Sequence, residues 1–510
     1  MNSYTLTDLQ QSSIDRLKQM NACVIALSPG CGKTILILHH IIHNVMKDNN
    51  DKCIFFIPKS ARASFIKEMT TRMNKEYILI CAGASYSYDE IAKHRFIFIE
   101  NTLVNKYIET LVSLASTNTC HLVIDEAHSL QNPESVFSQA AWEVRCYCKY
   151  IFAMTATPLL NNIEGLFNLY HFVYPKIFTS WFRFRSRYCI TQDHVIRMKN
   201  RQGKLIERKV TDIVGYQNMN ELNEILDKLT IKGCVHYNVN FEFVECQLDA
   251  ECEKPYKLAS NGLFDLLYHP EKAKQRLSKR KLQKDGEHSL TDDAKDFGSR
   301  LHDLQKIVDG CDESFDKSFI SNKMKSLCQK VFEIIQRNES TLIYFEYIDS
   351  LEMAERVLLE QQSMLGFTKI YRLTGAEKED YRAKIEANLG LKEIILCSQA
   401  ASQSRNLQRA NNIIVYNCPW SCGKLIQLCG RVCRTDSTYD HQNIYFISAA
   451  NTIDEYKVEL FHKRIGLIKL SLGDDSVGTL ESCECDYLDL DYSNIKELKN
   501  NLLWKRVSKS

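Results

Sequence analysis

The sequence predicts an α/β protein with two tandem parallel-sheet blocks and a helical, charged segment between them. Three observations support this class. Short apolar runs of strand length alternate with amphipathic stretches in the first part of the chain, and the same rhythm returns after residue 315. A glycine-rich loop also follows the first apolar run. Strands that alternate with helices are typical of βαβ units, which build parallel sheets.

Six apolar runs in the first block each have the length of one buried strand. They are rich in β-branched and aromatic residues, and amphipathic stretches such as Lys33–Met46 separate them. The predicted strands are Ala22–Leu27, Cys53–Ile57, Tyr77–Cys81, Phe96–Ile99, His121–Ile124 and Tyr150–Met154.

The second block repeats this pattern with five strands and three helices. The strands are Thr341–Phe345, Thr368–Leu373, Glu393–Cys397, Ile413–Tyr416 and Gln442–Ile447, and the helices are Met324–Arg337, Asp349–Glu360 and Cys422–Cys433. The predicted divisions are a first block over 1–178, a charged segment over 179–314, a second block over 315–475 and a tail over 476–510.

Composition limits the partners and the compartment. The net charge is only +2, so a nucleic-acid binder of this composition has to gather its positive charge locally. The 20 cysteines include no C-x-x-C pair, which argues against a zinc site and favours reduced thiols. No apolar run approaches the roughly 18 residues of a membrane span, and the first residues are polar. We therefore expect an intracellular protein, nuclear or cytoplasmic, with no membrane partner.

The loop after the first predicted strand has the features of a phosphate-binding loop. A strand, a G-x-G-K-T core and a helix follow one another, so backbone N–H groups and the helix N-terminus can converge on an anion. Lys33 would reach the β- and γ-phosphates of ATP, and Thr34 would hold magnesium. The strict motif has glycine where this chain has Leu27, and a chance turn is the alternative. The residues expected around the nucleotide are Leu27, Ser28, Pro29, Gly30, Cys31, Gly32, Lys33 and Thr34.

Two adjacent carboxylates, Asp125 and Glu126, end the buried run Leu122–Ile124. A carboxylate at a strand end can bind magnesium, directly or through water, and its neighbour can polarise an attacking water. We assign these roles to Asp125 and Glu126 respectively. An acidic pair without a role is the alternative, which the preceding phosphate loop disfavours.

A third strand end carries Thr155 and Thr157, within Met154–Pro158. These hydroxyls are candidates for sensing the nucleotide. By itself the pattern also suits an ordinary turn.

Arg431 and Arg434 lie three residues apart on a predicted helix of the second block. This spacing puts both on one helix face, and an arginine presented across a cleft can stabilise charge on a transferring phosphoryl group. A solvated basic helix face is the alternative.

The order of these motifs resembles the superfamily 2 helicases and translocases, most closely the Swi/Snf group of DNA-dependent ATPases, over residues 5–475. Further segments carry the resemblance: Leu6–Gln10, Pro58–Ser60, TATPLLNNIEGLFNLY, Asn406–Leu407, Pro419–Trp420 and Asn451–Glu455. The short middle segment is similar to compact viral members such as the baculovirus global transactivator.

The resemblance implies two RecA-like domains that close on ATP and magnesium. It implies that Gln10 contacts adenine, that Gln427 lies at the nucleotide, and that His128, Thr155 and Thr157 couple the nucleotide state to movement. It also implies nucleic-acid contacts near Ser60 and Thr102 in the first block, and near Ser398 and Asn406 in the second.

Several segments depart from the family pattern. Ser398–Arg405 lacks the two usual glycines, and the arginine pair expected near Leu229–Cys234 is absent. Two basic segments are further candidates for nucleic-acid contact: Trp181–Tyr188, which interleaves arginine with aromatic residues, and Lys272–Lys284. Their alternatives are an amphipathic helix packed on the first block and a solvated charged helix.

The predicted function is therefore an ATP-hydrolysing motor on duplex DNA without strong sequence preference, acting in transcription or chromatin, with transcription machinery as a candidate partner. One alternative is a strand-separating or annealing DNA or RNA helicase. A wedge hairpin between the motifs would favour it, and the sequence indicates none. The other alternative is a weakly active transcription cofactor that binds DNA or polymerase.

Overall fold

The computed structural model describes residues 5–28, 30–155, 163–199, 205–233, 238–268, 290–316, 318–375, 388–398, 410–420 and 441–459, with single positions 377, 381, 385, 425, 428, 429, 439 and 461. The chain forms two compact units that divide between Val235 and His236. We call them the first unit and the second unit and describe each by itself.

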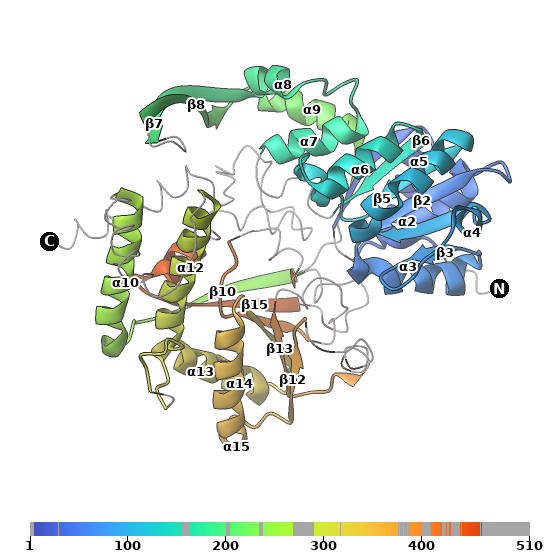
Figure 1. Cartoon of the computed structure of the whole chain (residues 1–510). Helices are drawn as coiled ribbons and strands as arrows, with labels where there is room; N and C mark the ends of the chain where they lie inside the picture. The colour runs from blue at the N-terminus through green and yellow to red at the C-terminus, as the bar shows by residue number, and fades with distance from the viewer. Residues whose placement is uncertain are drawn as a thin grey trace. The chain divides into compact units, whose positions relative to one another are not determined.

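The first unit is built on a parallel seven-stranded sheet in the order β3-β4-β2-β5-β6-β1-β9 (Figure 1). Its strands are β1 Ala22–Leu27, β2 Lys52–Ile57, β3 Ile78–Ile80, β4 Phe96–Glu100, β5 Cys120–Ile124, β6 Cys148–Met154 and β9 Thr230–Gly233. Its helices are α1 Asp8–Leu17, α2 Lys33–His40, α3 Arg62–Glu68, α4 Tyr88–Ala92, α5 Ile108–Thr117, α6 Val136–Arg145, α7 Ile163–Val173, α8 Trp181–Tyr188 and α9 Met219–Leu229. One π-helical turn, Ile41–Val45, continues α2, and another, Met69–Met73, continues α3.

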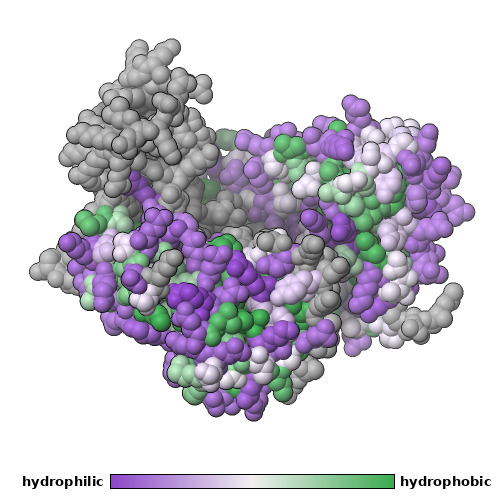
Figure 2. Space-filling model, turned by 60° about the horizontal axis from the view of Figure 1, so that its bottom comes forward, coloured by the Kyte–Doolittle hydropathy of each residue, from purple (hydrophilic) through white to green (hydrophobic). Residues whose placement is uncertain are grey.

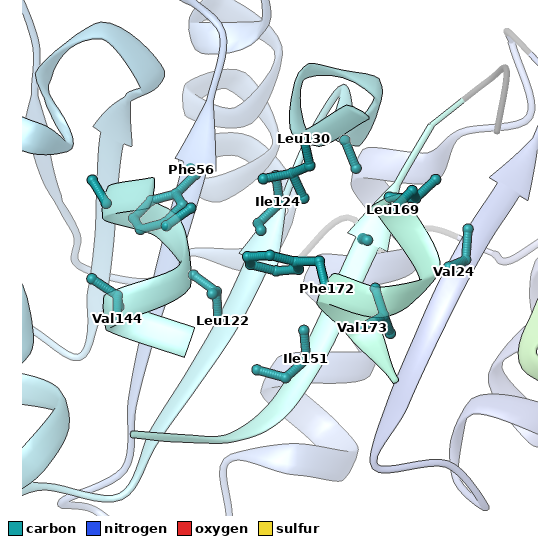
Figure 3. Packing of buried hydrophobic residues seen from close by; sticks show 14 of the residues in the cluster. Val24, Phe56, Leu122, Ile124, Leu130, Val144, Ile151, Leu169, Phe172 and Val173 are labelled. Carbon is teal, nitrogen blue, oxygen red and sulfur yellow. The ribbon is translucent and has the colours of Figure 1, made fainter. Parts of the chain in front are cut away.

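Helices cover both faces of this sheet, because alternate strand residues enter opposite hydrophobic layers. Phe56 and Ile124 pack in one layer with residues of α7 such as Phe172 (Figure 3). Phe55 and Val123 enter the other layer, which includes residues of α1, α2 and α3. Every residue of β2 and β5 is buried, as expected for the middle of a doubly covered sheet.

The second unit contains a parallel six-stranded sheet in the order β10-β15-β14-β11-β13-β12. Its strands are β10 Asn238–Cys246, β11 Thr341–Phe345, β12 Lys369–Leu373, β13 Glu393–Ser398, β14 Asn412–Val415 and β15 His441–Ala449. Its helices are α10 Ala250–Tyr268, α12 Leu290–Asp309, α13 Asn322–Gln336, α14 Ile348–Glu360 and α15 Gln362–Leu365. Hydrophobic layers again lie on both faces of the sheet. The prediction of two parallel-sheet blocks is confirmed.

The segment between the predicted blocks contains four strands that the sequence analysis does not identify. The short β9 joins the first sheet beside β1, and β10 joins the second sheet beside β15. The two units therefore share this segment. Strands β7 Cys189–Lys199 and β8 Leu205–Tyr216 pair with each other as an antiparallel hairpin. The expectation that no hairpin lies between the motifs is wrong. The two strands contain many polar residues, so neither forms the apolar run by which the other strands were predicted.

A cluster of charged side chains is buried inside the second unit. Lys323 of α13 is 1% exposed and donates to Asp309 at 2.7 Å and to Asp454 at 2.5 Å. The Gln305 amide donates to both carboxylates, at 3.1 Å and 2.8 Å, and its oxygen accepts from Lys457 at 2.8 Å. We call these five residues the buried charge cluster.

This cluster holds the segment Asn451–Glu455, one of the segments that carry the family resemblance, in place. Asp454 lies within it, and the backbone N–H of Ile453 donates to the Tyr256 hydroxyl at 2.8 Å. The second carboxylate oxygen of Asp309 accepts from Asn417 at 2.8 Å and from Ser350 at 2.6 Å. Segments far apart in the sequence are thereby held at one point of the second unit.

Hydrophilic side chains cover most of the coloured surface in Figure 2, with apolar residues in small groups between them. Among the described helices, none is long and apolar enough to cross a membrane.

Candidate nucleotide site

The predicted site residues of the first unit gather at one edge of its sheet. The carboxyl ends of parallel strands meet at the same edge, where α/β proteins bind ligands. The loop that begins at Ser28 follows β1, Ser60 follows β2, Thr102 follows β4, Asp125 follows β5 and Thr155 follows β6. These five segments thus follow five different strands of one parallel sheet.

The phosphate loop depends on glycines with positive φ. Gly30 has φ 86°, and Gly32, which precedes the first residue of α2, has φ 70° and ψ 39°. Residues with side chains rarely adopt this region. The loop is closed by a bond from the Cys31 N–H to the Ser28 carbonyl at 3.3 Å. The start of α2 directly after it contributes the positive end of a helix dipole, which favours an anion here.

Lys33 and Gln10 both bond to the loop backbone. The Lys33 ammonium donates to the carbonyls of Leu27 at 2.8 Å and Ser28 at 3.3 Å. The Gln10 amide donates to the carbonyl of Cys31 at 3.2 Å. A Cβ on Gly32 would lie 2.3 Å from that amide nitrogen, so Gln10 packs directly on the loop. This supporting role of Gln10 was not predicted from the sequence. The contact of Gln10 with adenine stays a prediction.

Asp125 and Glu126 differ in burial and in backbone conformation. Burial and the neighbouring Glu126 carboxylate raise the pKa of Asp125 to about 7, although Lys33 and His128 lower it. Glu126 has φ 49° and ψ 52°, an uncommon conformation for a residue with a side chain, and such residues cluster at functional sites. Its carboxylate lies 3.2 Å from Nδ1 of His128. Asp125 is therefore fixed and buried, whereas Glu126 is partly exposed beside a histidine.

A close packing contact connects the carboxylate segment to the next helix. The short 3₁₀ helix Ala127–Gln131 follows Glu126, and the Gln131 carbonyl accepts from the Asn168 amide of α7 at 2.8 Å. A Cβ on Gly165 would lie 2.8 Å from the Gln131 side-chain oxygen, so only glycine fits without a shift. Gln131, Gly165 and Asn168 were not predicted as site residues; the family-like segment around residue 165 was the available signal.

The remaining described candidates differ in exposure. Thr155 is fully buried, and its N–H donates to the Ile25 carbonyl of β1 at 3.0 Å. Ser60 is half-buried and Thr102 is exposed. Ser398 ends β13 of the second unit and is buried, which leaves its side chain little access to a nucleic acid.

An ion pair steadies the segments that carry Ser60 and Thr102. Arg62 begins α3, two residues after Ser60, and its guanidinium lies 3.3 Å from the carboxylate of Glu100, the last residue of β4. Glu100 is only 2% exposed. The segment after β2, which carries Ser60, is therefore linked to the end of β4, which precedes Thr102. Pro29, Thr157, Asn406, Gln427, Arg431 and Arg434 lie outside the described residues.

The donor chemistry at this edge suits magnesium. Asp125 supplies a carboxylate and Thr34 a hydroxyl, and hard oxygen donors are the ligands that magnesium prefers. Across the described part of the chain, no group of three His, Cys, Asp or Glu side chains could hold a metal. A magnesium ion here would therefore also need oxygens from the nucleotide and from water, which is its usual coordination in phosphate sites.

Comparison with family models gives two matches in chain order. Residues 11–289 match the SNF2-related domain, and residues 322–436 match the helicase conserved C-terminal domain. The first match alone covers more than half of the chain. This chain belongs to the SNF2-related domain family. The Swi/Snf resemblance is thereby confirmed, whereas the likeness to viral members stays a prediction.

Relatives of this SNF2-related protein are distant. The bifunctional helicase and thymine dioxygenase JBP2 of Trypanosoma cruzi is 22% identical over 488 residues, covering 85% of this chain and 44% of its own length. The CHD3-type chromatin-remodeling factor CHR7 of Arabidopsis thaliana is 22% identical, covering 93% of this chain and 37% of its own length. The uncharacterized ATP-dependent helicase YqhH of Bacillus subtilis is 22% identical, with 90% and 78% covered. The chain thus spans less than half the length of the first two relatives.

Among solved structures, the Sulfolobus solfataricus SWI2/SNF2 ATPase core in complex with dsDNA is similar at 19% identity. The match covers 92% of this chain and 94% of that one, with a TM-score of 0.39.

Proposed function

We propose that this SNF2-related protein is an ATP-hydrolysing motor that moves along duplex DNA. The observation that carries the proposal is the convergence of the Ser28–Thr34 loop, Asp125 and Glu126 at one sheet edge, within a chain that matches both family models. Moving along DNA requires two units that change their arrangement with the nucleotide. The predicted arginines of the second unit, Arg431 and Arg434, would complete the site only on closure, so that hydrolysis is gated by it.

The residues of the first unit supply most of the chemistry. Magnesium, when bound, would neutralise charge on the phosphates. Lys33 would exchange its bonds to loop carbonyls for bonds to phosphate oxygens, while Gln10 keeps the loop in place. Glu126 would accept a hydrogen bond from the attacking water and orient it, and His128, 3.2 Å away, would restrain that carboxylate. Thr155, which bonds to β1, and Gln131, which bonds to α7, would transmit movements of the nucleotide site to these two elements.

ATP hydrolysis with different polynucleotides tests the proposal. We expect duplex DNA to stimulate turnover more than single-stranded DNA or RNA does. Glu126→Gln should lower the turnover rate by about 10²- to 10⁴-fold, the usual contribution of a general base, while ATP binding persists. Stronger stimulation by single strands or RNA would indicate a helicase instead. Equal, negligible hydrolysis by wild type and variant would leave only the cofactor alternative.

A second candidate function is strand separation, because the β7–β8 hairpin lies between the site segments of the two units in the sequence. A hairpin in that position is the feature that the sequence analysis named as favouring unwinding. ATP-dependent displacement of one strand from a tailed duplex would support this candidate. Translocation without displacement would support the first.

The cellular role is part of the proposal. Work on chromatin or transcription, a nuclear site and contact with transcription machinery are predictions drawn from the chromatin-remodelling names among the relatives. A compact viral form is likewise a prediction. Pull-down of the intact chain from cells that express it would test the partner.

A further inference from the structure

A two-stranded ribbon extends from the first unit, and its composition differs from that of the rest of the chain. Helix α8 and strands β7 and β8 carry seven Lys or Arg residues against three Asp or Glu residues, a net charge of +4. The whole chain carries +2, so all the remaining residues together carry −2. We call α8, β7 and β8 the basic arm. The arm supplies locally gathered positive charge of the kind that a near-neutral nucleic-acid binder requires. The other basic candidate, Lys272–Lys284, lies outside the described residues.

The base of the basic arm is firmly built into the first unit. Phe184 and Tyr188 of α8 are buried in its hydrophobic layer, whereas Phe182 is 70% exposed. Arg187 makes two bonds of 2.7 Å to Glu221 of α9, and the Tyr188 hydroxyl donates to the same carboxylate at 2.8 Å. Arg187 is therefore a structural anchor. The packing alternative for α8 is confirmed for its buried aromatic face, and Arg183 on its other side is exposed.

The strands project from this base as a ribbon that pairs only with itself among the described strands (Figure 1). They pair over eleven residues of β7, from Cys189 opposite Tyr216 to Lys199 opposite Leu205, with one shift of register between Ile190 and Thr191. At about 3.4 Å per residue the ribbon is roughly 37 Å long, close to the 34–36 Å of one turn of B-DNA. An isolated two-stranded hairpin is only marginally stable, so contact with a partner would stabilise the ribbon.

Charge is distributed unevenly along the ribbon. In the register of the hairpin, Arg197 and Lys199 of β7 and Lys209 of β8 lie on one face, together with Glu207. Asp193 is on the same face but nearer the base, where its carboxylate accepts from the Thr211 hydroxyl at 2.7 Å. The end far from α8 is therefore the more basic part.

We propose that the basic arm binds the phosphate backbone of duplex DNA, outside the segments around Ser60 and Thr102. Phosphate contacts of this kind position a protein without reading sequence, which agrees with the expected lack of sequence preference. A two-stranded ribbon also has the width that a major groove admits. The inference rests on the proposed function, because it names a second DNA contact of the same motor.

The salt dependence of duplex binding tests the inference. The variant Arg197→Gln/Lys199→Gln/Lys209→Gln removes three charges from one face of the ribbon. Each phosphate contact contributes about 0.9 to the slope of log K against log salt concentration. Loss of three contacts should flatten the slope by about 2.7 and weaken binding by up to roughly 500-fold at 0.1 M salt. ATP hydrolysis without DNA should stay at the wild-type rate.

A matched control removes three positive charges from the edge of the first unit's sheet where the strands begin, opposite the edge that carries the candidate site. Lys47, Lys93 and Lys149 are exposed and lie before or at the start of β2, β4 and β6. Their triple Gln variant should bind duplex DNA almost like wild type.

The possible outcomes separate the inference from the proposed function. If both variants bind with the wild-type slope, the inference is overturned and the arm does not contact the phosphate backbone. If wild type itself binds no DNA, the proposed function fails first. Circular dichroism melting of each variant shows whether it is folded.

Discussion

Replacing Lys323 with methionine should strongly destabilise the second unit. Lys323 is 1% exposed and bonds to two carboxylates that are themselves buried, Asp309 and Asp454. Burial alone would lower the pKa of Lys323, but the two carboxylates outweigh it and hold the pKa above its ordinary value. Methionine has a similar volume and no charge, so the variant leaves two carboxylates facing each other without this cation.

Breaking a buried ion pair by removing one partner costs about 3–5 kcal/mol, because the remaining charge is not compensated. At about 1.4 kcal/mol per tenfold change, that is a loss of roughly 150- to 5,000-fold in the folding equilibrium. The double variant Lys323→Met/Asp454→Asn should recover part of the loss, because only one uncompensated carboxylate remains.

Urea unfolding and hydrogen exchange measure this effect. Exchange should accelerate in residues 305–309 and 451–457, which hold the cluster, before the sheet of the first unit is affected. Lys325→Met is the matched control: Lys325 lies on the same helix and is exposed, so its loss should change stability by less than about 0.5 kcal/mol. Equal stability of the Lys323 and Lys325 variants would refute the account of the cluster.

Two further predictions concern the first unit. Gly32→Ala should weaken ATP binding in a fluorescent-nucleotide titration, because φ of +70° is strained for alanine and the new Cβ, 2.3 Å from the Gln10 amide nitrogen, would displace that side chain from the loop. Adding Gln10→Ala removes the overlap but not the backbone strain, so wild-type affinity in either variant would contradict the loop geometry. His121 is buried, and burial lowers its pKa to about 4. The pKa of histidine in the unfolded chain is about 6.5. Between pH 6.5 and 4 the unfolded chain therefore binds a proton at His121 that the folded chain does not bind. The free energy of unfolding consequently decreases as the pH is lowered, by up to about 1.4 kcal/mol per pH unit. His121→Phe should remove this part of the pH dependence when the free energy of urea unfolding is measured between pH 6.5 and 4. An unchanged dependence on pH in the variant would show that His121 does not contribute.

The buried strands could be predicted from the sequence because composition marks them. The predicted runs Ala22–Leu27 and Thr341–Phe345 coincide with β1 and β11, since a doubly covered strand is apolar throughout. The four-residue β9 is different: its sequence, TIKG, carries little apolar signal, and its pairing with β1 is what makes it a strand. β10 alternates Phe241 and Phe243 with polar residues because it lies at the sheet edge.

The chemistry of the site was predictable where it depends on local order along the chain. The loop through Lys33 and the pair Asp125 and Glu126 follow strands that the sequence marks clearly. Contacts between distant segments were not predictable. Gln10 bonds to a loop 21 residues away, and Lys457 reaches Gln305 across 152 residues. Such contacts depend on tertiary packing, which no spacing rule encodes.

Displacement of a triplex-forming oligonucleotide from duplex DNA tests the central claim most directly. The third strand is removed when a motor travels along the duplex, and the duplex itself need not open. We expect wild-type protein to displace it in the presence of ATP and magnesium, and Glu126→Gln to bind the same DNA without displacing it. Hydrolysis of ATP with no displacement, or equal displacement by the variant, would contradict a motor that moves along duplex DNA.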